Sequence, residues 1–172
     1  MSASPRRPDR IKAANARYHD AAAEEYDFKW GIDFGPVGRE QVRGKLAKAL
    51  GGWPSRPFGD ALEIGSGTGY FGLNLMQLGL MERLVATDIS PGMLAHLAKS
   101  AAALGLDVHT EACDAEELPF EDASFDLVLG HAVLHHLPRL DVALAELRRV
   151  LRPRGSLAFC GEPSRYGDLI AV

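Results

Sequence analysis

The chain carries Glu63-Ile64-Gly65-Ser66-Gly67-Thr68-Gly69 at the point where a short apolar run gives way to a helical pattern. Alternating glycines at the end of a strand allow positive φ angles and let a ligand lie against bare backbone. The start of the helix that follows presents backbone N–H groups without intrahelical partners. A tight turn that binds nothing is the simpler alternative, but three alternating glycines disfavour it. The segment therefore predicts a ligand site at the carboxyl end of a strand.

Beyond this loop, short apolar runs alternate with helical segments. The predicted strands are 61–64, 83–87, 108–112, 125–129 and 156–159, and the predicted helices are 70–78, 92–104 and 140–151. Such alternation is typical of a mainly parallel sheet with helices on both faces. We therefore predict an α/β protein with a doubly wound sheet, in which residues 59–172 form the ligand-binding core.

The region before the sheet is predicted to be helical. Residues 1–10 are interpreted as a disordered tail, because the start of the chain has prolines and lacks an apolar anchor. An Ala-rich helix is predicted over 11–29, with Tyr18 and Tyr26 on one face. A second helix is predicted over 38–50, and residues 11–58 are assigned to these helices and a linker.

Composition limits the function classes. The 172 residues are 47% hydrophobic and 24% charged, which is typical of a globular protein. With 19 basic and 23 acidic residues, the net charge of −4 disfavours a broad nucleic-acid surface. No apolar run approaches the roughly 18 residues of a membrane span, so we expect no membrane insertion. No apolar segment of a secretory signal follows the N-terminus, so we expect a cytoplasmic protein.

The two cysteines, Cys113 and Cys160, are too few for a disulfide scaffold. The Cys and His spacings of structural zinc sites are absent from the sequence, so no metal site is predicted. Both cysteines are interpreted as small buried apolar residues, because no neighbouring base marks either as a nucleophile.

Two further carboxylates follow predicted strands. Asp88 ends the second strand, where it can accept hydrogen bonds from both ribose hydroxyls of a nucleoside. Its alternative role, a helix cap, suits Ser90 better, because Pro91 then takes the first helical position. Asp114 follows the third strand and can accept from an adenine amino group. In isolation Asp114 could equally be a surface residue, but Glu63, Asp88 and Asp114 follow three successive strands.

Two ligand classes compete for this crevice. The dinucleotide pattern GxGxxG occurs as Gly67-Thr68-Gly69-Tyr70-Phe71-Gly72, but its first glycine comes two residues after the strand end. The glycine loop contains no Lys or Arg that would favour a pyrophosphate, and acids crowd the crevice. This balance favours a cationic ligand over an anionic one.

In combination, these residues resemble class I S-adenosylmethionine-dependent methyltransferases, in particular the small-molecule branch of ubiquinone and menaquinone biosynthesis. The resemblance covers residues 58–163 and includes the segments Leu118–Val128, Leu134–Leu137 and Glu146–Gly155. It implies a Rossmann-like fold, an N-terminal helical lid, a small-molecule acceptor, and S-adenosyl-L-methionine as the cofactor, with S-adenosyl-L-homocysteine as its product. The cofactor-binding residues implied are Tyr18, Tyr26, Glu63, Gly65, Ser66, Gly67, Gly69, Asp88, Ile89, Met93, Asp114, Ala115 and His131.

The resemblance also gives these positions separate roles. Asp88 would bind the ribose, Ile89 would pack on the adenine, and Asp114 would accept from the adenine amino group with backbone help from Ala115. Glu63 would help hold the methionine amino end. The backbone of His131, just beyond the fourth strand, would face the methionine moiety.

Methyl transfer from a sulfonium is an in-line displacement that needs alignment and a dry site more than acid–base chemistry. A base is required only for acceptors that lose a proton, and His135 and His136 are the candidates, with His19 a weaker one. The competing interpretation places one of the adjacent histidines against the sheet and the other in solvent. Two other functions stay open: a non-catalytic module that binds the cofactor, and an NAD(P)-dependent oxidoreductase.

The end of the chain leaves little sequence after the fifth strand. The methyltransferases it resembles usually continue with a helix and two further strands, which residues 165–172 are too few to supply. We therefore expect a core that is C-terminally incomplete, either a fragment or a domain completed by a partner chain or missing segment. The fifth strand would then be an unprotected edge.

Overall fold

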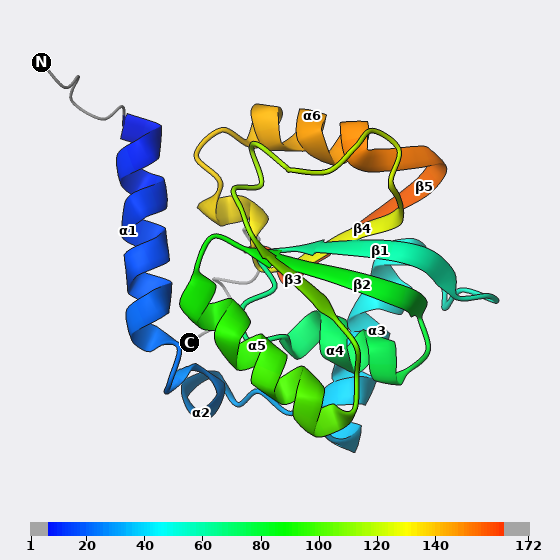
Figure 1. The fold of residues 1–172 in the computed structure, drawn as a ribbon. Coiled ribbons are helices and arrows are strands. Elements are labelled where there is room, and N and C mark those ends of the chain that lie inside the picture. Colours follow the sequence, from blue (N-terminus) through cyan, green and yellow to red (C-terminus); the bar gives the residue numbers. More distant parts are fainter. Residues whose placement is uncertain (1–6, 164–172) are drawn as a thin grey trace, which may run out of the picture.

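A computed structural model describes residues 7–163 of the chain (Figure 1). Its elements in chain order are α1 (Arg7–Ala22), α2 (Tyr26–Trp30), α3 (Pro36–Leu50), β1 (Phe58–Ile64), α4 (Tyr70–Gln77), β2 (Met81–Asp88), α5 (Pro91–Leu104), β3 (His109–Ala112), β4 (Phe125–His131), the 3₁₀ helix η1 (Leu134–His136), α6 (Leu140–Val150) and β5 (Leu151–Cys160).

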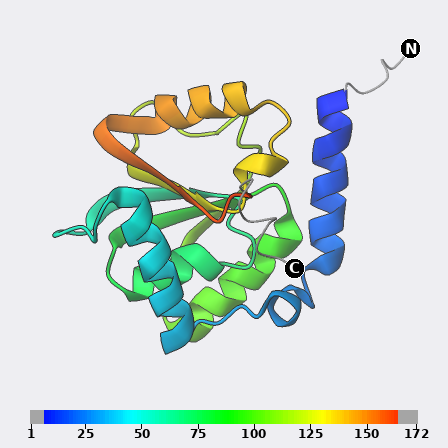
Figure 2. The same cartoon turned by 180° about the vertical axis from the view of Figure 1, so that it is seen from behind.

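The five strands form one parallel sheet in the order β3-β2-β1-β4-β5. Helices α3, α4 and α5 cover one face and α6 covers the other, while α1 stands beside the carboxyl edge of the sheet (Figures 1 and 2). The predicted α/β fold with helices on both faces is confirmed. Strand order reverses direction at β1, which is where such sheets bind ligands.

The core has one apolar cluster on each face of the sheet. Successive side chains of β1 alternate between them, so that Ala61 joins the α3–α5 cluster and Leu62 joins the α6 cluster. The same alternation directs Glu63 toward α4 and Ile64 toward the α6 cluster. Glu63 is therefore a buried carboxyl at the end of the central strand.

The predicted N-terminal boundaries are wrong in two respects. Residues 7–10 were expected in the tail, yet they form the first turns of α1, because a proline is tolerated there and Asp9 is well placed at the positive end of the helix. The single helix expected over 11–29 is broken at residues 23–25, where Ala23 is buried. Tyr18 and Tyr26 therefore lie on different helices. Residues 1–6 lie outside the described part of the chain.

Strand β5 begins earlier than predicted, at Leu151 directly after α6. Its pairing with β4 shifts register, from Phe125↔Leu151 to Leu127↔Ser156. Arg154 takes a positive φ of 70° within this irregularity, which marks a local bulge.

In the described sheet β3 and β5 are the two edge strands. The expectation about residues 165–172 falls outside the described residues. Among the helices of residues 7–163, none is long and apolar enough to cross a membrane.

Candidate functional site

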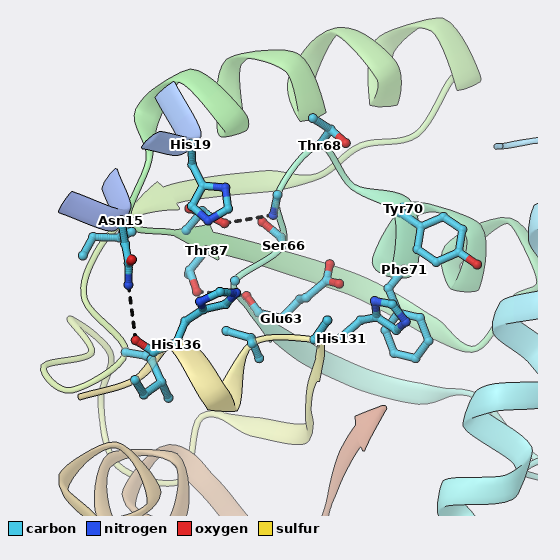
Figure 3. A pocket seen from close by; sticks show the side chains of 18 of the residues that line it. Asn15, His19, Glu63, Ser66, Thr68, Tyr70, Phe71, Thr87, His131 and His136 are labelled. Atoms are coloured by element: carbon cyan, nitrogen blue, oxygen red, sulfur yellow. Dashed lines mark hydrogen bonds between the residues drawn. The ribbon is translucent and has the colours of Figure 1, made fainter. Parts of the chain in front are cut away.

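A pocket lies at the carboxyl ends of the strands, bounded by the glycine loop, α1 and the segment after β4 (Figure 3). Most of the residues predicted to bind the cofactor line it, namely Tyr26, Glu63, Gly65, Ser66, Gly67, Asp88, Ile89, Asp114, Ala115 and His131. Of the predicted catalytic pair, His136 lines it and His135 does not. Tyr18, Gly69 and Met93 also lie outside the lining.

The loop glycines are required for different reasons. Gly65, Gly67 and Gly69 have φ angles of 58°, 53° and 98°, a region that favours glycine. A Cβ on Gly65 would lie 2.2 Å from Val133 Cγ2, whereas a Cβ on Gly67 would meet nothing within 4 Å. Gly67 thus leaves open space beside the loop backbone.

Three of the residues predicted to bind the cofactor do not face the pocket. Gly69 caps α4, and its open side faces the side chains of Leu73 and Leu97 rather than the pocket. Met93 is only 1% exposed, because the capped first turn of α5 directs its side chain into the core. Tyr18 is 55% exposed and its ring packs on the edge of His19 instead.

Asp88 ties β2 to the glycine loop. Its Oδ2 accepts a hydrogen bond from Gly67 N at 2.9 Å, and its Oδ1 accepts one from Ser90 N at 2.9 Å. Ser90 is the cap of α5, since its Oγ accepts from Met93 N at 3.1 Å. Burial raises the pKa of Asp88, although these backbone hydrogen bonds act to lower it. Each carboxylate oxygen keeps capacity for a further donor.

Glu63 and Ser66 are partly unpartnered. Glu63 Oε1 accepts from Gly72 N at 3.2 Å, but Glu63 Oε2 and Ser66 Oγ are buried without a hydrogen-bond partner among residues 7–163. Burial, assisted by the charge of Asp88, raises the pKa of Glu63 to about 8. The carboxyl is therefore largely protonated at neutral pH and can donate a hydrogen bond.

The last glycine of the dinucleotide pattern has a packing role. A Cβ on Gly72 would lie 2.2 Å from Glu63 Oε2 and 2.8 Å from Leu84 Cδ2. The buried carboxyl of Glu63 therefore explains why residue 72 is glycine, without any pyrophosphate.

Asp114 is paired with a cation that the sequence did not indicate. Lys12 Nζ lies 2.5 Å from Asp114 Oδ2 and 2.5 Å from Glu116 Oε2. Burial acts to lower the pKa of Lys12, but the hydrogen bonds to Asp114 and Glu116 outweigh it, so the pKa is raised. The glycine loop itself contains no basic residue, as expected, but α1 brings a lysine from far away in the sequence to the acids of the crevice.

Helix α1 covers the pocket through polar contacts, and none of its residues is buried. Asn15 Nδ2 donates to the His136 carbonyl at 3.3 Å, as Figure 3 shows. Asp20 Oδ1 accepts from Ser90 Oγ at 2.5 Å and from Gly92 N at 3.0 Å. Helix α1 is therefore held over the pocket by polar contacts rather than by buried apolar side chains.

The chain between α1 and α3 adds a contact to the glycine loop. Asp27 Oδ1 accepts a hydrogen bond from Thr68 Oγ1 at 2.5 Å, and Tyr26 lines the pocket beside it. The break after α1 makes this approach possible, so tertiary contacts outweigh the helix propensity of the segment.

The two adjacent histidines have different polar partners, although their ring centroids lie 4.0 Å apart. His135 Nδ1 lies 2.8 Å from Glu162 Oε2, outside the pocket, whereas His136 lies in the pocket with its ring 6.0 Å from that of His19. Burial, together with His135 and His19, lowers the pKa of His136. Both histidines are exposed, so the interpretation that one of them packs against the sheet is wrong.

His131 is the last residue of β4, and its ring contacts a lysine of α3. Lys45 Nζ lies 2.9 Å from His131 Nε2. The ring also lies 5.3 Å from that of Phe71 and 5.4 Å from that of Tyr70. Burial, followed by the charge of Lys45, lowers the pKa of His131 to about 4.

The cysteines are thiols at neutral pH. Burial raises the pKa of Cys113, which lines the pocket, to about 11, and it also raises the pKa of Cys160. Neither thiol therefore has the low pKa of a nucleophile.

Comparisons with known proteins are consistent with this geometry. The profile of a family described as "Methyltransferase domain" matches residues 62–159. A malonyl-[acyl-carrier protein] O-methyltransferase of Methylococcus capsulatus is 40% identical over 110 residues, which are 62% of this chain and 37% of that protein. A demethylmenaquinone methyltransferase of Deinococcus radiodurans is 34% identical over 136 residues, covering 79% of this chain and 55% of that protein.

Among solved structures, a phosphoethanolamine N-methyltransferase 2 of Haemonchus contortus superposes with a TM-score of 0.71 at 23% identity. It covers 92% of this chain, which covers 38% of that protein, and the likeness concerns the fold. The chain spans 37% to 60% of the length of the curated relatives that it matches.

Proposed function

This chain belongs to the methyltransferase domain family, and we propose that it transfers a methyl group from S-adenosyl-L-methionine to a small-molecule acceptor. The observation that carries the proposal is the hydrogen bond from Gly67 N to Asp88 Oδ2 within the pocket. It holds a carboxylate against a glycine loop at the point where strand order reverses, which is the arrangement that binds a ribose.

The pocket offers matching groups for the other parts of this cofactor. Asp114 and Ala115, beyond β3, are the acceptor and backbone donor for the adenine edge. Glu63 and Ser66 line the same pocket, and the buried Oε2 of Glu63 and Oγ of Ser66 lack hydrogen-bond partners within the described part of the chain. Because buried polar atoms rarely stay unpartnered, these two are suited to the amino-acid end of the cofactor.

When bound, the sulfonium supplies a leaving group that is already activated by its positive charge. The protein then has to orient the acceptor in line with the methyl group and exclude water. Helix α1 contributes to both through its contacts across the pocket mouth, including Asn15 with His136. Asp88 contributes negative charge that favours a cationic ligand.

His136 is the residue that we assign as a base for acceptors that must lose a proton. Its lowered pKa keeps the imidazole neutral at physiological pH, and its ring lies in the pocket with that of His19. The named activities of the relatives modify a malonyl-[acyl-carrier protein] and a demethylmenaquinone. Carboxylates and quinols are therefore the first acceptors to examine.

Calorimetric titration with S-adenosylhomocysteine tests the proposal. We expect saturable binding to the wild-type protein and at least tenfold weaker binding to Asp88→Ala, since a hydrogen bond to a charged group contributes about 1.5–3 kcal/mol. Asp107→Ala, at an exposed site after α5, is the matched control and should bind like the wild type. Equal binding by the Asp88 and Asp107 variants, or none by the wild type, would exclude the proposal.

Transfer is measured separately from binding. Release of S-adenosylhomocysteine from S-adenosylmethionine would be followed with carboxylate, quinol and amine acceptors, with acceptor-free reactions as the blank. Turnover that depends on one acceptor class identifies an enzyme. Tight cofactor binding without turnover on any class would favour the non-catalytic module instead.

A further inference from the structure

Lys45 on α3 is a half-buried cation without a carboxylate partner among the described residues. Its Nζ lies 2.9 Å from His131 Nε2 and donates to Tyr70 Oη at 3.4 Å. Burial lowers the pKa of Lys45, and only the thiolate form of Cys160 would oppose this effect. A lysine that is removed from solvent is usually paired with an acid. Because Lys45 has no such partner among the described residues, we infer that it has another role.

The chemistry of the contact fixes the proton on His131. An ammonium group is a donor only, whereas a neutral imidazole has one donor and one acceptor nitrogen. Because Lys45 donates to Nε2, the proton of a neutral His131 must lie on Nδ1. A second proton is disfavoured because the ring is enclosed by Phe71 and Tyr70 and lies beside a cation.

Other charges near His131 do not reverse this conclusion. Glu162, after β5, raises the pKa of His131, but burial and Lys45 have the larger effects. Tyr70 on α4 and Cys160 on β5 both have raised pKa values because of burial, so both are neutral at physiological pH. The ring therefore carries no charge and one fixed N–H.

We propose that Lys45 is a positioning residue that fixes His131 as the neutral Nδ1–H tautomer, and that this N–H donates to the carboxylate at the amino-acid end of the bound cofactor. The proposal rests on the proposed function, because it takes the ligand of the pocket to be S-adenosylmethionine or its product. Lys45 stands behind the ring and strengthens the donor through its charge.

The order of the strands supports the placement of the cofactor's amino-acid end at His131. Asp114 follows β3 and Asp88 ends β2, whereas His131 ends β4 on the other side of β1. Three strand spacings of about 4.8 Å separate β3 from β4 by ~14 Å. An extended ligand with its nucleoside at Asp88 and Asp114 therefore reaches His131 with its amino-acid end. At the nucleoside end the pocket cation, Lys12, is already paired with acids.

The tautomer is tested on the ligand-free protein by long-range ¹H–¹⁵N correlation NMR, with His131→Asn used to assign the signals. We expect the Nδ1–H pattern in the wild type, with no titration from about pH 5.5 to 8. Lys45→Met should give a mixture of tautomers and a pKa raised toward the ordinary value. Lys45→Arg should restore the wild-type pattern, and Lys48→Met, exposed on the same helix, should leave it unchanged.

An Nε2–H pattern in the wild type, or titration of His131 near neutrality, would overturn the assignment of Lys45. This readout needs no cofactor, so it is independent of the proposed function. Failure of the wild type to bind S-adenosylhomocysteine would remove the proposed function and the ligand assignment while leaving the NMR result valid.

The source of the carboxylate is tested by calorimetry with S-adenosylhomocysteine and its decarboxylated analogue. Lys45→Met should weaken the affinity for S-adenosylhomocysteine about tenfold and leave the affinity for the decarboxylated analogue within about twofold of the wild type, because only S-adenosylhomocysteine carries the carboxylate. Equal losses for both ligands would overturn the carboxylate assignment. The assignment would also be overturned if Lys45→Met kept its affinity for both ligands but, when saturated with S-adenosylhomocysteine, bound benzoate more weakly than the saturated wild type. That result would place the anion on the acceptor instead of the cofactor.

Discussion

Lys12 in the covering helix and Asp114 beyond β3 form an ion pair with 2.5 Å between Nζ and Oδ2. The same ammonium contacts Glu116, whose carboxylate is buried and also bonds Arg139 Nε at 2.6 Å. The residue proposed to recognise adenine is thus linked directly to the helix that covers the pocket. The position of α1 and the nucleoside end of the site are therefore coupled through this ion pair.

Replacing Lys12 with Met should loosen α1 from the core. We expect amide hydrogen exchange in α1 to become about tenfold faster at neutral pH, because hydrogen bonds to charged groups contribute about 1.5–3 kcal/mol. The folded-state pKa of Lys12 is raised, so its contribution is complete at neutral pH and disappears only as pH rises through the folded pKa, above 10.5. Lys99→Met, at an exposed site in α5, is the control. Identical exchange in both variants would contradict the coupling.

Two glycine-to-alanine changes should have opposite effects on stability. Gly72→Ala places a Cβ 2.2 Å from the buried Glu63 Oε2, so we expect a loss of about 1–3 kcal/mol from the free energy of unfolding. Gly44→Ala in α3 meets nothing within 4 Å, so we expect a gain of about 0.5–1 kcal/mol. Urea denaturation measures both. A Gly72→Ala protein as stable as the wild type would show that Glu63 does not occupy this space.

The buried carboxyl of Glu63 should make stability depend on pH. Its pKa is about 8 in the folded protein and 4.5 as a free group, so the folded state binds the proton more tightly. The contribution of the protonated carboxyl is therefore complete below pH 4.5 and is lost as pH rises toward 8. Glu63→Gln lacks this titration, so its stability relative to the wild type should increase between pH 5 and 8. A difference that stays constant across this range in urea denaturation would refute the assignment.

His136 and His135 should differ in kinetics. With an acceptor that must lose a proton, we expect His136→Ala to lower kcat by about 10²–10⁴-fold, the usual contribution of a general base. Affinity for S-adenosylhomocysteine should change little. His135→Ala, whose partner is Glu162, should retain most of kcat. The lowered pKa of His136 also predicts that the acid limb of the kcat/KM profile lies below pH 6.5. Equal kcat losses in the two variants would exclude His136 as the base.

The features predicted correctly depend on local sequence. Alternation of apolar runs and helical segments indicated the parallel sheet, and the Ser90-Pro91 pair indicated the start of α5, because caps and first turns are specified by adjacent residues. The positions of Asp88 and Asp114 followed from the rule that parallel strands bring their carboxyl ends to one edge.

The features that were missed depend on contacts between distant segments. Lys12 and Lys45 lie in segments predicted as helices, far in sequence from their partners, and only the packed fold brings them to Asp114 and His131. The break after Ala22 was missed because helix propensity is overridden when Ala23 is buried and Asp27 reaches Thr68.

We propose that the pocket binds an adenosyl sulfonium ligand at the glycine loop rather than a dinucleotide. Calorimetric titration of one preparation with S-adenosylmethionine and with NADH tests this directly. We expect saturable binding of S-adenosylmethionine and no binding of NADH, because Asp88 and Asp27 hydrogen-bond to the loop and the packing of Gly72 against Glu63 accounts for the last glycine of the dinucleotide pattern. Saturable binding of NADH without binding of S-adenosylmethionine would contradict it.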